Sequence, residues 1–129
     1  MELQVYKNTT LREVKEKFSH YFPFLQLEFY VYEHHTEDRQ PSKAVYKGLY
    51  LEETSDFFKE GTIHFSSSTS VGDLEQKFQI ELGLVAKVFR KSGESWIDTT
   101  QTNHLSLGRQ NNMGAVVTRH HFNLHTLSL

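Results

Sequence analysis

The sequence predicts an α+β fold that consists of a tandem β-α-β-β-α repeat followed by a C-terminal strand. Two amphipathic helices with the same apolar spacing begin near residues 10 and 70, and a run typical of a β-strand follows each of them. A shorter helical segment in each half then ends at a glycine and precedes another apolar run. Because this order holds through several elements, we interpret residues 1–61 and 62–129 as two copies of one unit in one compact structure.

The two long helices are predicted from apolar residues at positions i, i+3, i+7 and i+11, which form one stripe of an amphipathic helix. Thr10 with Glu13, and Ser70 with Asp73, are start signals of the capping-box type. Pro23 ends the first helix and Gly83 ends the second. The stripes consist of Leu11, Val14, Phe18 and Phe22 in the first half, and of Val71, Leu74, Phe78 and Leu82 in the second.

A half-buried strand is predicted at residues 25–31, where apolar and polar side chains alternate. In the matching strand at 85–91, Lys87 interrupts the alternation, which either a one-residue slip between the copies or a β-bulge explains. Ser92-Gly93 predicts a tight turn into a strand at 96–99. The first half has a polar loop at 33–42 in place of this turn, and then a short strand at 44–46.

Short helices at 52–59 and 105–112 are expected to end at Gly61 and Gly114 in left-handed caps. Strands then follow at 62–65 and 115–118, and alternation from 116 to 124 extends the second of these strands toward the C-terminus. Residues 62–119 alone give the order β-α-β-β-α-β of a ferredoxin-like split βαβ unit. Because βαβ crossovers are right-handed, we expect mixed sheets with the helices on one face.

The composition excludes several classes of site. The chain has 129 residues and no cysteine, which rules out disulfides, thiol catalysis, iron–sulfur clusters and cysteine-based zinc sites. A net charge of −2 shows no excess of basic residues of the kind that nucleic-acid binding requires. The start has no secretory signal, and no run is long or apolar enough for a membrane span. We therefore expect a soluble, cytoplasmic protein that binds neither nucleic acid nor membrane.

No catalytic or cofactor motif is recognisable. The seven glycines form no phosphate-binding loop, and no pair of acid–base residues has a diagnostic spacing, so we predict no catalytic residue and no cofactor. Eight histidines are unusual for this length. In the expected C-terminal strand, His120 and His121 would face opposite sides, and His121 would lie about 13 Å from His125. We therefore predict no metal site.

Four residues remain as candidates for binding. Tyr30 and Tyr32 lie on the nominally polar face of the strand at 25–31, which suits a protein interface. Trp96 and Asp98 could line a ligand cleft between the repeats. The sequence favours a non-enzymatic interaction or assembly module that self-associates as a homodimer. A small-ligand-binding domain is the alternative, and a histidine–aspartate acid–base enzyme is a more distant one.

Overall fold

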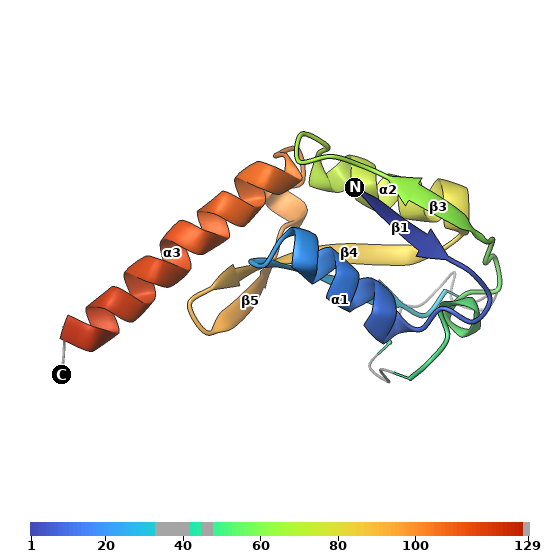
Figure 1. Cartoon of the computed structure of the whole chain (residues 1–129), viewed down its shortest axis with the longest axis horizontal. Coiled ribbons are helices and arrows are strands. Elements are labelled where there is room, and N and C mark those ends of the chain that lie inside the picture. The colour runs from blue at the N-terminus through green and yellow to red at the C-terminus, as the bar shows by residue number, and fades with distance from the viewer. Residues whose placement is uncertain (33–41, 45–47, 128–129) are drawn as a thin grey trace.

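The computed structural model describes residues 1–32, 42–44 and 48–127, the side chains of the last four excepted (Figure 1). The elements that precede the second long helix are β1 (Glu2–Val5), α1 (Leu11–Tyr21), β2 (Leu25–Tyr30), the 3-10 helix η1 (Leu51–Thr54) and β3 (Gly61–His64). The later elements are α2 (Val71–Leu82), β4 (Val85–Ser92), β5 (Ser95–Asp98), the 3-10 helix η2 (Thr100–Thr102) and α3 (Leu107–Leu127).

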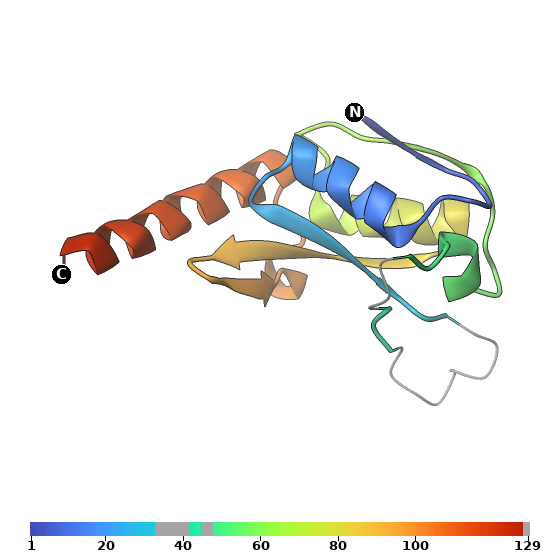
Figure 2. The ribbon, with the colours of Figure 1, turned by 60° about the horizontal axis from the view of Figure 1, so that its bottom comes forward.

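The strands form two antiparallel sheets. β1 pairs with β3, and β4 lies between β2 and β5 in a second sheet. Since α1 links β1 to β2 and α2 links β3 to β4, each helix connects one sheet to the other, and Figure 2 shows both helices between the two sheets. The α+β class is confirmed. The expected mixed sheet is wrong, because each β-α-β connection changes sheets rather than returning to the same one, and a ferredoxin-like sheet is not found among the described strands.

Both long helices have the starts and the buried stripes predicted for them. The Thr10 hydroxyl accepts a hydrogen bond from the Glu13 amide, and the Ser70 hydroxyl accepts one from the Asp73 amide. Gly83 ends α2 in the left-handed region with a φ of 64°. The buried stripe residues are Leu11, Val14, Phe18, Phe22, Val71, Leu74, Phe78 and Leu82.

The core lies between the sheets and draws on both halves of the chain. Phe18 of α1 and Phe78 of α2 have no exposed surface. The ring centroid of Phe18 lies 5.6 Å from that of Phe22, and the ring of Phe78 meets the ring of Phe29 edge-on at 5.6 Å. Each half thus supplies a fully buried phenylalanine to one core.

The inward side chains of the first two strands of this sheet are Leu25, Leu27 and Phe29 in β2, and Leu84, just before β4, with Ala86 and Val88 in β4. Val88 follows Phe29 by 59 residues, whereas Phe78 follows Phe18 by 60. The β2–β4 ladder continues from Leu25 to Tyr30 without interruption. The mismatch between the halves is therefore a slip in the helix-to-strand turn rather than a bulge.

The strands expected at 62–65, 85–91 and 96–99 correspond to β3, β4 and β5. The turn at Ser92-Gly93 is confirmed, because Gly93 has a φ of 65°. The loop expected at 33–42 and the strand expected at 44–46 lie mostly outside the described residues.

The predicted helix at 52–59 is wrong beyond its first turn. Only Leu51–Thr54 is helical, and it forms the 3-10 helix η1. Ser55 then leaves the helix and donates a hydrogen bond from its hydroxyl to the Gly83 carbonyl at 2.6 Å. Gly61 begins β3 and has no positive φ, so it is not a left-handed cap. A contact with a distant turn thus replaces the helix that the local sequence indicates.

The predicted C-terminal strand is wrong, because Leu107–Leu127 is one helix, α3. The short helix expected at 105–112 continues through Gly114, whose φ is not positive. A Cβ atom at Gly114 would lie 3.0 Å from the Phe24 Cβ and 3.2 Å from the Lys91 carbonyl oxygen. Glycine at this position therefore lets α3 approach β4 closely and does not end the helix.

α3 packs on β4 and to a lesser extent on β2, and it continues past the tip of the β4–β5 hairpin (Figures 1 and 2). Its buried side has the same i, i+3, i+7, i+11 spacing as the other helices but a different chemistry. The buried residues at this spacing are Leu107, Gln110, Gly114 and Thr118. Beyond them, every residue from Arg119 to Asn123 is exposed.

Candidate functional site

The two tyrosines predicted as an interface have different surroundings. Tyr30 lies on the outer face of the β2–β4–β5 sheet, whereas Tyr32 lies beyond the end of β2. Burial raises the pKa of Tyr30 above its ordinary value, and the charges of Asp98 and Glu28 raise it further. The Tyr32 ring packs 4.8 Å from the ring of Phe57 in the same chain. Tyr32 thus already has an intrachain partner.

Glu28, next to Tyr30 on the outer face, belongs to an internal ionic cluster. Its carboxylate is 3.1 Å from the Lys15 ammonium through both oxygens and 3.6 Å from the Lys43 ammonium, and it also accepts a hydrogen bond from the Gln26 amide. Only 3% of Glu28 is exposed. The Lys43 ammonium also lies 5.4 Å from the Phe89 ring centroid. Much of this face is therefore committed to intrachain contacts.

Trp96 and Asp98 lie on the same face of β5. Trp96 is 40% exposed, and the Lys91 ammonium lies 5.9 Å from its ring centroid. Asp98 accepts hydrogen bonds from the hydroxyl of Thr100 and, at 2.6 Å, from its backbone amide. These bonds hold the pKa of Asp98 below its ordinary value, and the charge of Lys87 also lowers it. Asp98 is therefore ionised at neutral pH.

A hollow of about 620 Å³ lies where β5 leads through η2 toward α3. Its volume falls in the range of roughly 300–1,000 Å³ that is typical of small-molecule sites. Of the two residues predicted to bind a ligand, Asp98 lines this hollow and Trp96 does not. The lining residues are Arg90, Asp98, Thr100, Gln101 and Thr102.

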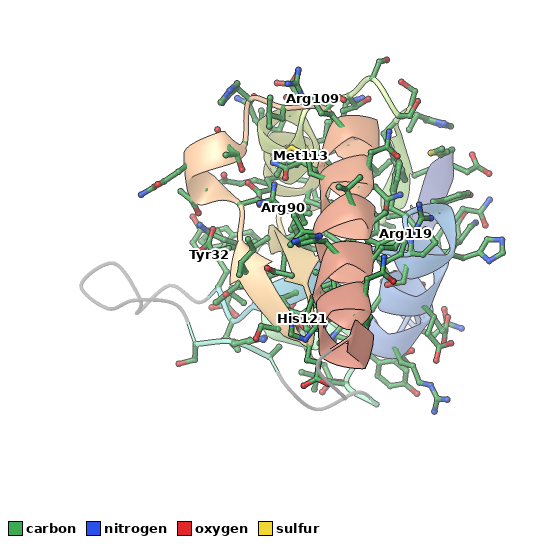
Figure 3. The ribbon with its side chains drawn as sticks, turned by 90° about the vertical axis from the view of Figure 1, so that its left-hand side faces the viewer. Tyr32, Arg90, Arg109, Met113, Arg119 and His121 are labelled. Carbon is green, nitrogen blue, oxygen red and sulfur yellow. The ribbon has the colours of Figure 1, made fainter. Side chains whose placement is uncertain are left out.

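Sequence reasoning missed Arg90, which a buried network holds in the wall of the hollow. The Arg90 Nη1 atom donates to the Gln110 side-chain oxygen at 2.9 Å and lies 3.7 Å from the Met113 sulfur. The Gln110 amide nitrogen donates to the Thr102 carbonyl at 2.7 Å and to its hydroxyl at 2.9 Å. Figure 3 shows Arg90 and Met113 close together beside α3. The one available signal was that Gln110 follows Leu107 by three residues, which is the spacing of a buried helix stripe. The Gln110 side chain is polar, so the apolar pattern did not reveal it.

A second feature is an apolar surface where α3 leaves β5 uncovered. Ile97 pairs with Arg90 and therefore lies on the face of the sheet over which α3 packs, yet it is 37% exposed. Met113 contacts Arg90 from α3, and Val117 follows one turn later with 44% of its surface exposed. Val116 is 64% exposed. We call Ile97, Met113, Val116 and Val117 the α3–β5 surface.

Hydrogen bonding fixes which side of α3 faces β5. The Asn111 side-chain oxygen accepts a hydrogen bond from the Phe24 amide at 2.8 Å, so this side of the helix faces β2. Met113 follows two residues later, about 200° around the helix, and therefore faces away from β2 toward β5. Arg119 projects from the other side of α3 (Figure 3).

The helical tail also changes the arrangement of the histidines. His121 and His125 lie four residues apart on α3, which is about one helical turn. The separation expected for a strand is therefore wrong, and it no longer argues against a metal site. Among the side chains that the structure describes, no three metal-binding groups cluster. The His121 ring packs against the Phe122 ring at 5.4 Å.

No family model, curated protein or solved structure matches the chain. Within the described part of the chain, no helix has the length and apolar character that a membrane span requires. Function is therefore inferred from the geometry of the chain alone.

Proposed function

We propose that the protein is a non-enzymatic assembly module that self-associates through the α3–β5 surface. The observation that carries this proposal is the orientation of α3, which after Leu107 buries only small or polar residues, Gln110, Gly114, Ala115 and Thr118 among those described, but exposes Val116 and Val117. A surface helix of a globular protein normally turns its apolar side toward the core. The reverse arrangement supports a partner on the exposed side, because contiguous exposed apolar groups mark interaction sites.

The exposed side of α3 has the spacing of a coiled-coil seam. Met113, Val117 and His120 are separated by four and then three residues, and Leu124 and Leu127 continue this alternation in the sequence. Alternating steps of three and four residues allow two helices to pack along their length. One polar residue in such a seam is tolerated and fixes the register, so His120 is compatible with pairing.

A second copy of the chain suits this surface. In a two-fold dimer each subunit presents the same patch, so the seam of α3 would pack against itself. Arg119, the fixed charge nearest to the valines in the sequence, projects from the side of the helix away from Met113 (Figure 3) and, three residues after Val116, would flank the contact. β5 has β4 as its one ladder partner among the described strands, and all four of its side chains are exposed. Open edges of this kind readily pair with another strand.

The size of the surface indicates a weak dimer. Residues 113–127 extend about 21 Å at a rise of about 1.5 Å per residue. A stable interface buries roughly 800 Å² on each partner, and a helix pair of this length buries less. We therefore expect a dissociation constant in the micromolar range, with a measurable monomer fraction on dilution.

The sheet face that carries Tyr30 is a weaker candidate for the contact. Glu28 and its lysine partners occupy the β2 side of that face, and Tyr32 packs against Phe57 within the chain. A partner there would have to pack over an ionic cluster that is already satisfied. On the described part of the α3–β5 surface, the Met113 sulfur contacts Arg90, and no ionic cluster is present, so we place the self-association there.

We also infer that the two halves derive from one repeated unit. The first strands of the halves pair with each other, and so do the second strands. Leu3 pairs with Ile63, and Glu28 pairs with Lys87, a relation expected of two copies around a two-fold axis. The inference predicts that the equivalent positions Phe18 and Phe78 are both core residues, which the substitutions described in the Discussion measure.

Analytical ultracentrifugation from low to high micromolar concentration tests the self-association. We expect the unmodified protein to shift reversibly from monomer to dimer, and Val116→Glu combined with Val117→Glu to remain monomeric. Ile80→Glu is the matched control, because Ile80 on α2 is 63% exposed and Val116 is 64% exposed. A monomer at every concentration would refute self-association. Loss of the dimer in Tyr30→Glu with Tyr32→Glu, but not in the valine variant, would move the interface to the sheet face.

A further inference from the structure

Arg90 has donor groups that no part of the described chain engages. It is half-buried, and its Nη1 atom faces two neutral acceptors, the Gln110 oxygen and the Met113 sulfur. No carboxylate of the described residues lies within ion-pair distance of it, and its Nε and Nη2 atoms have no acceptor among them. Nε and Nη2 form one edge of the planar guanidinium, and such an edge matches the two oxygens of a carboxylate.

The guanidinium is held in position before any ligand arrives. Gln110 is completely buried, and both of its amide hydrogen bonds go to Thr102. These bonds leave the Gln110 side-chain oxygen directed at Arg90. A donor that is fixed in advance loses little conformational freedom on binding, which favours affinity for a small ligand. A buried glutamine whose contacts serve to hold an arginine at a hollow is better explained by ligand binding than by packing alone.

We propose that the hollow beside η2 binds a small monocarboxylate, whose oxygens pair with the Nε–Nη2 edge of Arg90. Thr100, Gln101 and Thr102 supply a neutral polar wall for the remainder of the ligand. Asp98 also lines the hollow, but the strand register places its side chain on the opposite face of the sheet from that of Arg90. A singly charged carboxylate balances the one charge of Arg90, whereas a phosphate dianion or a dicarboxylate would leave an excess negative charge there.

None of the five lining residues belongs to the α3–β5 surface, but Arg90 contacts Met113 of that surface, so binding has to be measured apart from self-association. The measurement can therefore be made at a protein concentration at which the monomer predominates. If no dimer forms, ligand binding by the monomer can still be measured. If no ligand binds, the dimer can still be detected by ultracentrifugation.

Nuclear magnetic resonance titration with acetate, propionate and pyruvate tests the proposal, and inorganic phosphate and methylammonium serve as controls. We expect the Arg90 Nε–H resonance and the amides of Thr100–Thr102 to shift and to saturate with the monocarboxylates. Arg90→Lys keeps the charge but removes the fork, so it should weaken binding by about tenfold or more. Arg119→Lys, which changes an exposed arginine on the opposite side of α3, should leave binding unchanged.

Gln110→Glu provides a second test that keeps the Arg90 side chain itself. The new carboxylate cannot donate to the Thr102 carbonyl as the Gln110 amide does, and it would neutralise the guanidinium inside the chain, so acetate binding should be strongly weakened while the Arg90 resonance remains visible. Shifts that never saturate, equal effects of Arg90→Lys and Arg119→Lys, or tighter binding of phosphate than of acetate would each overturn the proposal.

Discussion

Gly114 decides how closely α3 can approach β4, and its replacement by alanine tests that approach. A Cβ atom there would lie 3.0 Å from the Phe24 Cβ, 3.0 Å from the Arg90 Cγ and 3.2 Å from the Lys91 carbonyl oxygen. The Arg90 side chain can move, but the Phe24 and Lys91 atoms belong to the backbone or are attached directly to it. The new methyl group must therefore push the helix away from the sheet.

Two opposing effects set the magnitude. Alanine is favoured over glycine inside a helix by about 1 kcal/mol, whereas overpacking a close contact costs roughly 1–3 kcal/mol. We expect Gly114→Ala to lower the free energy of unfolding by about 1 kcal/mol. Gly72→Ala on α2 is the control, because its nearest contact would be an ordinary 3.4 Å to the Asn103 carbonyl oxygen. That variant should be more stable by about 0.5 kcal/mol.

Urea unfolding followed by circular dichroism measures both variants, and their difference of about 1.5 kcal/mol exceeds the usual extrapolation error. Hydrogen exchange adds a local measurement, because the Gly93 amide donates to the Thr118 hydroxyl at 3.2 Å only while α3 is docked. We expect faster exchange at Gly93 in Gly114→Ala than in Gly72→Ala. If Gly114→Ala is as stable as Gly72→Ala and protects Gly93 equally, α3 does not pack on β4 in this way.

The remaining predictions concern the core, one buried acid and metal. Phe18→Ala and Phe78→Ala should each lower the free energy of unfolding by about 3–5 kcal/mol, and Ile80→Ala by less than about 0.5 kcal/mol, in the same urea assay; a loss at either phenylalanine as small as that of Ile80→Ala would contradict its place in the core. Burial raises the pKa of Glu75, so the folded state binds this proton more tightly than the unfolded state does, and stability should fall as pH rises above about 4.5. Glu75→Gln, whose side-chain oxygen can still accept the Val88 amide, should remove this fall in urea titrations between pH 4 and 8; an unchanged pH profile would contradict it. Thermal melts with and without a chelator should coincide, and a drop of more than a few degrees would reveal a structural metal.

The elements that the sequence predicted correctly have local signals. α1 and α2 combine an apolar stripe with a capping hydroxyl, and these features need no knowledge of the rest of the chain. The turn at Gly93 and the left-handed cap at Gly83 are equally local, since a positive φ favours glycine. The pairing of β1 with β3 joins residues about sixty positions apart, and no periodicity encodes which strand finds which partner.

The candidate site was predicted only in part, for a related reason. Asp98 stood out as an acid near the end of a strand, and it does line the hollow. Arg90 gave no signal, because its position depends on Gln110, and Gln110 reaches it only if the chain after η2 forms a helix that returns over β4. An error in one secondary-structure element thus removed a tertiary contact from consideration.

The same residues that misled the prediction of α3 support its proposed role in assembly. The run from Ala115 to Val117 is typical of a strand, because β-branched residues lower helix propensity. In the structure both valines are helical and exposed, so they lose helix stability without gaining burial within the chain. Polar contacts hold the helix instead, through Gln110 to Arg90 and Thr118 to Gly93. Valines placed so unfavourably for the isolated chain become favourable once a second α3 covers them, and for this reason the α3–β5 surface is the first place to look for self-association.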